Sequence, residues 1–464
     1  MFCSRSSASN DRQRCTSMVT LSSVTVLYLC VISLAFAQYE ESVEHLLPDN
    51  VTHAAEDTRT KEIMFRQMLD EVPRFDGGGM MFQGDMLMTA EELGEMYGLA
   101  PPRSIIWPGR VIPYRIHESS INETDLIRTA IAHWTNNTCI QFRELGPDDT
   151  TTDFLVFVRG NGCWSRLGYV GSIQPISIGK NCETLGTVIH EIGHAVGLYH
   201  EQSRSDRDRF IVVNYGNVLE GKRTQFDPAV QKRDYGARYD YQSVMHYSRN
   251  AFAATPEMKT LHPRNPLLAH LIQRGDGLTF RDRSKVSHLY TCDADCTSKP
   301  ECLNEGFVDQ TCKCVCPPNT KGTNCEDQVR PYYARPTCGG RVIREKTIVS
   351  PGYPIGQQPH HRICVWWIQA PVNNRVQLTF RDFDLFGRIR GSCIYDSLEI
   401  RLDNIYVGKT VCGNEIPTNT TVGSVRRSAL LEYKPHARFT RGFSVDVTFI
   451  PAEEVPGQMN NSTS

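Results

Sequence analysis

Apolar and polar positions divide the chain into stretches of different pattern. Residues 18–37 form an almost uninterrupted apolar run. Residues 123–134 place apolar side chains at helical spacing and predict an amphipathic helix, whereas the apolar run 154–158 is typical of a buried strand. Residues 184–189 are compatible with a helix, and beyond residue 338 alternating apolar and polar positions predict a β-sandwich. The pattern therefore predicts a part with mixed helices and strands, followed by an all-β part.

The first apolar run has the features of a signal peptide. Three arginines precede it, and it ends in the small residues Ala35 and Ala37 before the chain becomes polar. An uncleaved membrane anchor is the competing interpretation, because the basic leader is long. The small residues favour cleavage, so we expect residues 1–37 to be removed and the product to be secreted, without a membrane anchor.

Length and composition are those of ordinary globular domains. At 464 residues the chain exceeds the size of one hydrophobic core, so about three domains of about 150 residues each are expected. Apolar residues make up 40% and charged residues 22%, which argues against a membrane transporter or a disordered polymer. The formal net charge of -2 implies no basic face for a nucleic acid, so partners have to be inferred from sites.

The cysteines indicate an oxidising compartment. Three of the 17 lie in the expected signal peptide, so 14 remain, and an even number suits full pairing. They form three groups of even size, each of which can be a self-contained disulfide domain. The groups are Cys139, Cys163, Cys182 and Cys292; Cys296, Cys302, Cys312, Cys314, Cys316 and Cys325; and Cys338, Cys364, Cys393 and Cys412. Asn-x-Ser/Thr glycosylation sites, which agree with the secretory route, begin at Asn50, Asn122, Asn136, Asn419, Asn460 and Asn461.

A histidine motif that begins at His190 is the strongest chemical signal. Residues four apart lie on one face of a helix, so His190 and His194 can direct two imidazole nitrogens at one zinc ion. Glu191, one position along, would reach a water at the metal instead of the metal itself. Gly197 permits the left-handed conformation that turns the chain back, so that His200 can supply a third nitrogen. Three protein ligands leave a position open for water and substrate, as catalysis requires.

Two other interpretations of this motif are core histidines that satisfy hydrogen bonds and a closed structural zinc site. Three histidines, a glutamate and a glycine at this spacing arise by chance with a probability of about one in ten thousand. A structural site would also leave Glu191 without a task. We therefore predict a catalytic site with one zinc ion per chain.

The motif His190–His200 resembles the metzincin signature, and its continuation over residues 201–208 resembles the astacin form of that signature. Residues 243–247, Ser-Val-Met-His-Tyr, are similar to the family's Met-turn. The resemblance implies a secreted zinc metalloendopeptidase. Its multidomain fold would include an α+β catalytic domain, in which a sheet of the five-stranded type is combined with an active-site helix.

The resemblance also implies roles for single residues. Met245 would form an apolar floor beneath the histidines, where a thioether packs well against flat rings. Tyr247 would be a displaceable zinc ligand that then donates a hydrogen bond to the developing oxyanion. Glu191 would take a proton from the attacking water and deliver it to the leaving amine. Glu201 would bind the new N-terminal amine after activation, and its alternative interpretation is a surface carboxylate.

Residues 38–103 have the loose, polar pattern of a pro-region, with helix or strand signals mainly over 59–71. Phe-Gln-Gly-Asp at 82–85 resembles the family's pro-segment motif, whose aspartate occupies the position at zinc that water later fills. Asp85 is therefore the candidate switch, because a hard oxygen ligand can fill zinc's open position and Gly84 allows a close backbone approach. A solvated turn is the alternative.

The end of the pro-region is open between residues 97 and 103. Family spacing points to cleavage near Gly98, whereas Arg103 offers a trypsin-like site. The peptidase domain would then occupy residues 104–293. A substrate would lie as an extra strand beside a sheet edge, for which 172–177 is the candidate. The resemblance implies the bridges Cys139–Cys292 and Cys163–Cys182, which spacing alone leaves open.

Two modules are expected behind the peptidase domain. Residues 294–326 resemble a small disulfide-rich EGF-like unit without a convincing set of calcium ligands, and we interpret it as a spacer. Residues 338–450 resemble an all-β CUB sandwich, and 451–464 would be a flexible tail. The pairing implied by these resemblances is Cys296–Cys312, Cys302–Cys314, Cys316–Cys325, Cys338–Cys364 and Cys393–Cys412.

The CUB-like segment departs from the calcium-binding pattern of many CUB domains. Asp396 is present, but Phe386 stands where a glutamate is expected, and Lys434 and Pro435 replace a later acidic position. Calcium needs several oxygen ligands, so we predict no strong calcium site. The module could still bind a protein substrate or the extracellular matrix.

Two rival functions are a catalytically inactive adhesion protein and a structural matrix component. The intact zinc motif argues against the first, and the lack of repeats and low-complexity tracts argues against the second. The sequence thus predicts a secreted zymogen that hydrolyses extracellular proteins or peptides. The sequence does not distinguish between hatching, moulting, collagen maturation and digestion as the biological process, so the substrate stays open, and so does the oligomeric state.

Overall fold

The computed structural model describes residues 79–100, 104–229, 234–273, 275–333, 336, 338–356, 363–435 and 440–452. The expected signal peptide, most of the expected pro-region, Arg103 and nearly all of the expected tail lie outside these ranges. Among the described residues, no helix has both the length and the apolar character needed to cross a bilayer.

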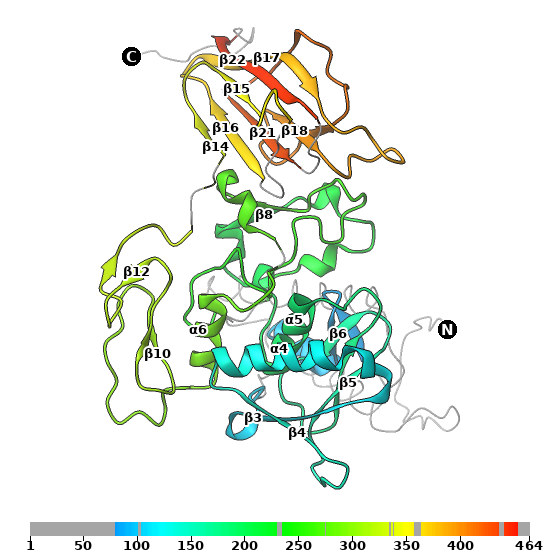
Figure 1. Cartoon of the computed structure of the whole chain (residues 1–464), viewed down its shortest axis with the longest axis vertical. Coiled ribbons are helices and arrows are strands. Elements are labelled where there is room, and N and C mark those ends of the chain that lie inside the picture. The colour runs from blue at the N-terminus through cyan, green and yellow to red at the C-terminus, as the bar shows by residue number, and fades with distance from the viewer. Residues whose placement is uncertain are drawn as a thin grey trace, which may run out of the picture. The chain divides into compact units, whose positions relative to one another are not determined.

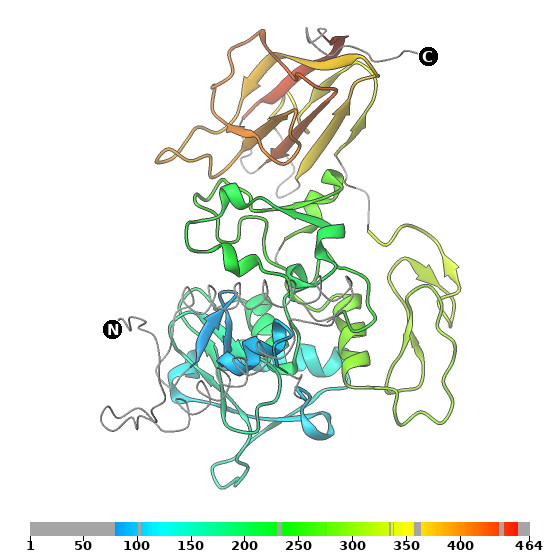
Figure 2. The same ribbon diagram turned by 180° about the vertical axis from the view of Figure 1, so that it is seen from behind.

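A mixed seven-stranded sheet organises the N-terminal half of the described chain (Figure 1). Its order is β1-β2-β6-β7-β5-β3-β4, and five of these strands, β3 to β7, belong to the expected peptidase domain. The other two form a hairpin in the expected pro-region, drawn in blue in Figure 2. The strands are β1 Met80–Phe82, β2 Met86–Met88, β3 Val111–Ile116, β4 Gln141–Glu144, β5 Leu155–Val158, β6 Cys163–Arg166 and β7 Gln174–Ile178.

The edges of the five peptidase strands are β6 and β4, which corrects the expectation for residues 172–177. Those residues largely form β7, which lies between β5 and β6 and is an interior strand. The reason is local: β6 folds antiparallel onto β7 with Ser165 opposite Ile176, whereas β5 runs parallel along its other side. The apolar run 154–158 that predicts a buried strand does form β5.

Two helices pack beside each other against this sheet, α4 (Thr124–Asn137) and α5 (Leu185–Val196). The Thr184 side chain caps α5 by accepting the N–H of Thr187, and Gly197 ends the helix with φ 113°. Trp134 of α4 is fully buried, and its indole N–H donates to the carbonyl of Ile189 at 3.1 Å. One apolar core therefore holds the active-site helix against both α4 and the sheet.

The remainder of this domain consists of short elements and a third helix, α6 (Phe280–Leu289). Thr279 and Asp282 form a capping box at the start of α6. The strands β8 Ile211–Val213 and β9 Leu261–Pro263 pair with each other. The 3-10 helices are η1 Pro108–Arg110, η2 Glu118–Glu123, η3 Glu201–Ser203, η4 Arg207–Arg209, η5 Tyr215–Asn217, η6 Arg223–Phe226 and η7 Pro266–Leu271.

Seven disulfides join all fourteen cysteines of the described chain in the pairs that the resemblance implies. In the peptidase domain, Cys139–Cys292 connects the end of α4 to the chain just after α6. Three bridges join cysteines within residues 296–325. The short strands of this part of the chain are β10 Phe307–Val308, β11 Cys314–Val315, β12 Thr320–Lys321 and, just after the last cysteine, β13 Asp327–Gln328.

The C-terminal part contains two sheets whose apolar side chains share one core, as a β-sandwich does. The order of the first sheet is β14-β16-β21-β18-β19, and that of the second is β15-β22-β17-β20. The strands are β14 Gly339–Val342, β15 Lys346–Val349, β16 Cys364–Gln369, β17 Asn374–Asp384, β18 Ser397–Leu402, β19 Lys409–Val411, β20 Thr420–Gly423, β21 Ser428–Lys434 and β22 Gly442–Pro451.

The residues that bear on calcium in this sandwich are Asp396, Phe386 and Lys434. The buried carboxylate of Asp396 accepts a hydrogen bond from the Thr440 hydroxyl at 2.8 Å. The side chain of Phe386 has no oxygen to offer a calcium ion, and its ring packs edge-on against Tyr395 at 4.8 Å between centroids. The expectation of no strong calcium site stays a prediction.

Loss of Cys139–Cys292 should destabilise the peptidase domain more than loss of Cys163–Cys182. The first bridge spans 153 residues and the second 19, for which chain entropy gives about 5 and about 3 kcal/mol. Scanning calorimetry of the precursor should show a lower unfolding temperature for C139S/C292S than for C163S/C182S. Equal unfolding temperatures would contradict this expectation.

Candidate active site

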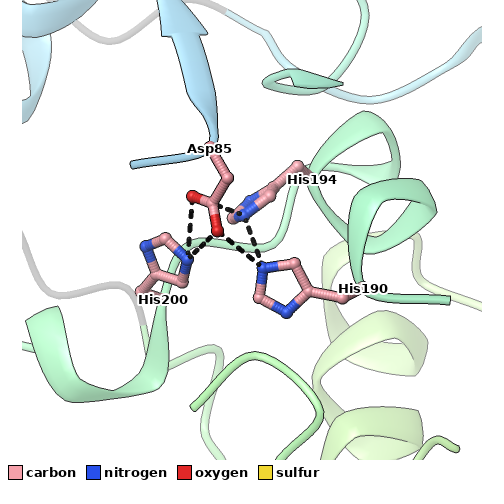
Figure 3. Close-up of side chains that lie close together, drawn as sticks. All are labelled: Asp85, His190, His194 and His200. Carbon is pink, nitrogen blue, oxygen red and sulfur yellow. Dashed lines mark hydrogen bonds and ion pairs between the residues drawn. The ribbon is translucent and has the colours of Figure 1, made fainter. Parts of the chain in front are cut away.

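Three histidine side chains and one aspartate converge on a single point (Figure 3). His190 and His194 project from one face of α5, and the turn at Gly197 brings His200 back towards them. The Nε2 atoms of His190 and His194 are 3.1 Å apart. The carboxylate oxygens of Asp85 lie 3.2 Å from Nε2 of His190, 3.6 Å from that of His194 and 3.1 Å from that of His200.

The opposite ring nitrogens show which atoms face this point. Each Nδ1 lies at hydrogen-bond distance from an oxygen that can only accept, so Nδ1 carries the proton and the Nε2 lone pair faces inward. The acceptors are the carbonyls of Val244 and Leu198 and the amide oxygen of Gln83, at 2.7, 2.8 and 2.9 Å from His190, His194 and His200 respectively.

This donor set fits a zinc ion. Ligand atoms about 2.0–2.1 Å from zinc in a tetrahedral arrangement are about 3.3 Å apart, close to the separations found among the four side chains. Inward lone pairs and a carboxylate repel one another unless a cation lies between them. Burial lowers the pKa of His194, and it lowers that of His200 to about 4, so both rings are neutral at physiological pH, as metal ligands must be.

Met245 packs against α5, the helix that carries His190 and His194. Its sulfur packs so closely on α5 that a Cβ at Gly193 would lie 2.6 Å from it, so any larger residue at that position would displace the thioether. Met245 and Val244 are both almost fully buried. The carbonyl of Val244 accepts the Nδ1 proton of His190, so the turn that carries Met245 also orients the first histidine.

The pro-region hairpin places Asp85 at the site by extending the sheet. Strand β2 pairs parallel with the edge strand β6, with Met86 opposite Ser165. The N–H of Ser165 also donates to the carbonyl of Asp85 at 2.9 Å. Phe82 and Met86 are fully buried in a separate apolar cluster, which anchors the hairpin on both sides of the aspartate.

Gln83 is a site residue that the sequence reasoning missed. Its side chain accepts from His200 through Oε1 and donates to the carbonyl of Asp227 through Nε2, at 2.9 and 3.2 Å. Its backbone carbonyl accepts the hydroxyl of Tyr247. The only signal in the sequence is the position of Gln83 inside the pro-segment motif, because nothing local reveals contacts with residues more than a hundred positions away.

The remaining predicted site residues also lie near the histidines. Glu191 is fully buried on α5, one position after His190. The ring of Tyr247 lies 4.6 Å from that of His200, and burial raises its pKa well above 10, so its hydroxyl stays a hydrogen-bond donor. Glu201 follows His200 and is buried, so it is not a surface carboxylate.

Three of the six expected glycosylation sites fall on described residues. The side chains of Asn122, Asn136 and Asn419 are exposed, as glycan attachment requires. Asn50, Asn460 and Asn461 lie outside the described residues.

The fold and the site together define a metallopeptidase domain followed by a CUB domain. The family model for the astacin peptidases matches residues 101–291, and that for the CUB domain matches residues 338–446. Zinc metalloproteinase dpy-31 of Caenorhabditis elegans is 31% identical over 410 residues, which cover 82% of this chain and 68% of that protein. The chain belongs to the astacin family, which confirms the family predicted from the zinc motif.

Other proteins are similar to parts of this chain. Blastula protease 10 of Paracentrotus lividus is 36% identical over 364 residues, covering 72% of this chain and 59% of that protein. The chain spans about 60% of the length of such curated relatives. Among solved structures, high choriolytic enzyme 1, a hatching enzyme zinc-protease from Oryzias latipes, is 33% identical, with a TM-score of 0.38. It covers 41% of this chain and 96% of its own.

Replacement of Gln83 by alanine in the precursor should loosen the pro-segment. The buried Nδ1–H of His200 would lose its acceptor, at a cost of about 1–3 kcal/mol. We expect faster limited proteolysis of the pro-region and a lower unfolding temperature. Glu91→Gln is the matched control, because Glu91 is exposed on the nearby helix α3 (Ala90–Met96). Equal proteolysis rates for Gln83→Ala and the control would show that the contact is unimportant.

Proposed function

We propose that the chain is a secreted zinc metalloendopeptidase, made as an inactive precursor, that hydrolyses peptide bonds in extracellular proteins. The observation that carries the proposal is the convergence of three imidazoles whose Nε2 atoms face one point that Asp85 closes. Membership of the astacin family supports it, and so do the names of relatives described as zinc metalloproteinases.

His190, His194 and His200 would hold one zinc ion per chain. When bound, zinc makes a water molecule more acidic and polarises the scissile carbonyl. The Nδ1 hydrogen bonds of the three rings fix their orientation and their tautomer before substrate arrives.

Glu191 and Tyr247 supply the proton chemistry in this proposal. The carboxylate of Glu191 accepts the proton of the attacking water and returns it to the leaving amine. Tyr247 donates its hydroxyl to the oxyanion that develops on the substrate carbonyl. In the precursor that hydroxyl donates to the carbonyl of Gln83, so removal of the pro-region frees it for the substrate.

Asp85 and its hairpin keep the precursor inactive in two ways. The carboxylate takes the place at the histidines that water needs, and β2 occupies the edge of β6 that a substrate strand would use. Full activation therefore requires removal of the whole hairpin, with cleavage expected between residues 97 and 103.

Secretion and the accessory modules complete the proposal. Seven disulfides in the described chain suit an oxidising, extracellular compartment. Residues 294–326, with three bridges, suit an EGF-like spacer, and the CUB domain is proposed to bind a protein substrate or the matrix. The rival role as an inactive adhesion protein gains no support, since the chain retains every side chain that the mechanism needs.

Replacement of Glu191 by alanine should abolish most activity without removing the metal. Loss of the general base is expected to lower kcat by about 10²–10⁴-fold. The measurement is casein or gelatin cleavage by the processed enzyme, together with zinc content by atomic absorption. Chelators should abolish wild-type activity and added zinc should restore it. Undiminished activity of Glu191→Ala would refute the mechanism.

Replacement of Asp85 by alanine should give a partly active precursor. The place at the histidines becomes open to water, while β2 still covers β6, so we expect activity between those of the wild-type precursor and the mature enzyme. A short fluorogenic peptide assayed before any processing measures this, with Glu91→Gln as the control. A silent Asp85→Ala precursor would count against the switch.

A further inference from the structure

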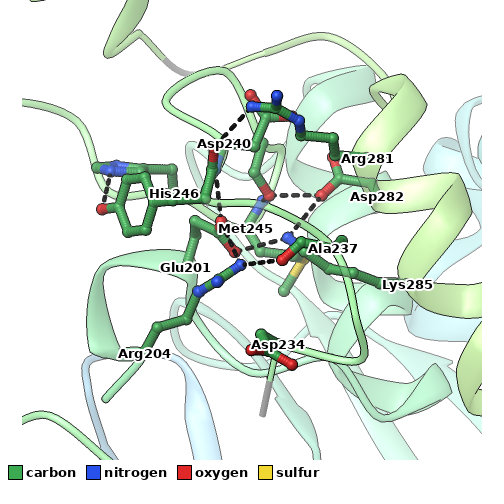
Figure 4. Close-up of polar contacts among 12 residues, drawn as sticks. Glu201, Arg204, Asp234, Ala237, Asp240, Met245, His246, Arg281, Asp282 and Lys285 are labelled. Atoms are coloured by element: carbon green, nitrogen blue, oxygen red, sulfur yellow. Dashed lines mark hydrogen bonds and ion pairs between the residues drawn. The ribbon is translucent and has the colours of Figure 1, made fainter. Parts of the chain in front are cut away.

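A buried cluster of charged side chains connects the segment that follows His200 with α6 (Figure 4). The side chains of Glu201, Asp282 and Lys285 are at most 5% exposed. These residues come from two places: Glu201 directly follows the ligand His200, whereas the other two lie on α6. Buried charges are costly unless they are paired and hydrogen-bonded, so the geometry of this cluster is tightly determined.

The backbone N–H and both carboxylate oxygens of Glu201 are hydrogen-bonded. Its backbone N–H donates to the carbonyl of Met245 at 2.9 Å, which ties the segment after His200 to the Met-turn. Oε1 accepts from the N–H of Asp240 at 2.7 Å and from Arg204 at 3.3 Å. Oε2 accepts from the ammonium of Lys285 at 2.6 Å. The carboxylate of Glu201 is therefore paired with the ammonium group of Lys285 while the pro-region is still present.

Asp282 supports the other side of the site. Its carboxylate accepts from the hydroxyl of Ser243 at 2.6 Å and from the N–H of Val244 at 3.0 Å. The carbonyl of the same Val244 accepts the Nδ1 proton of His190 at 2.7 Å. Asp282 thus fixes the residue whose carbonyl sets the orientation and the tautomer of His190.

Lys285 lies between these two carboxylates. Its Nζ is 2.6 Å from Glu201 and 3.5 Å from Asp282. Arg204 reaches Glu201 as well, but it makes its two 2.9 Å contacts with Asp206. Among the described residues, Lys285 alone forms ion pairs with both Glu201 and Asp282. Burial works to lower the pKa of Lys285, but the two carboxylates outweigh it and raise that pKa, so the side chain remains an ammonium ion.

We propose that Lys285 is a positioning residue of the zinc site. Its ammonium group links Glu201, which directly follows His200, to Asp282, which holds the residue that orients His190. Without it, Asp282 would have no ion-pair partner among the described residues and Glu201 would keep only the longer contact with Arg204, so the two buried carboxylates would move apart. Glu201 is the residue next to His200, and Asp282 is linked to His190 through Val244. A displacement of either carboxylate would therefore reach the Nε2 atoms. The inference rests on the proposed zinc site and adds a residue to it.

The experiment measures zinc affinity directly, by competition with a chromophoric chelator, on the processed full chain. Lys285→Met keeps the volume but removes the charge, and we expect zinc to bind about 10–100-fold more weakly. Lys285→Arg keeps the charge and should recover part of the affinity. Arg283→Met is the matched control, because Arg283 lies on the same helix and donates to the carbonyl of Asn137 instead.

A double variant separates positioning from simple destabilisation. Glu201→Gln combined with Lys285→Met removes both charges, so the protein should fold even if Lys285→Met does not. The expected order of zinc affinity is wild type, then the double variant, then Lys285→Met. Wild-type affinity in Lys285→Met or in the double variant would overturn the inference. If the wild type itself binds no zinc, the proposed function fails instead.

Discussion

The site depends on a directional constraint: three imidazole rings have to aim their Nε2 lone pairs at one point inside a nearly dry interior. Two of the rings are oriented by backbone carbonyls, those of Val244 and Leu198, and backbone can serve this purpose only if the fold holds it still. The core around Trp134 and the left-handed turn at Gly197 meet that requirement, one by packing α5 and the other by reversing the chain. The chemistry is therefore a consequence of tertiary structure, and not of the motif alone.

The pro-region meets the same constraint from outside the domain. Asp85 supplies an anionic oxygen at the centre, Gln83 supplies the acceptor for the Nδ1–H of His200, and the backbone of the hairpin continues the sheet. The positive φ of Gly84, 89°, lets the chain pass close to Phe252, where any Cβ would collide with the ring. In the proposed precursor, inhibition would thus use the hydrogen-bonding groups of the site instead of covering them.

Features with a local physical cause could be predicted from the sequence. The i, i+4 spacing of two histidines predicts a shared helical face, and Gly197 predicts the reversal that brings in the third; α4 and β5 follow from their apolar patterns. Features that depend on distant contacts were missed or wrong. The prediction of a sheet edge at residues 172–177 was wrong, because strand order in the sheet depends on distant pairing. The roles of Gln83 and Lys285 were missed, because they arise from contacts with His200 and Glu201, more than eighty positions away.

The parallel pairing of β2 with β6 has one further consequence. Once the hairpin is gone, the amide of Ser165 and its neighbours form a bare strand edge next to the histidines. Such an edge accepts the main chain of almost any extended peptide, because backbone groups are the same in every sequence. Under the proposed function, discrimination among substrates would then fall to the few side chains beside the scissile bond, and the processed chain would be exposed to unwanted pairing with other strands, as every uncovered strand edge is.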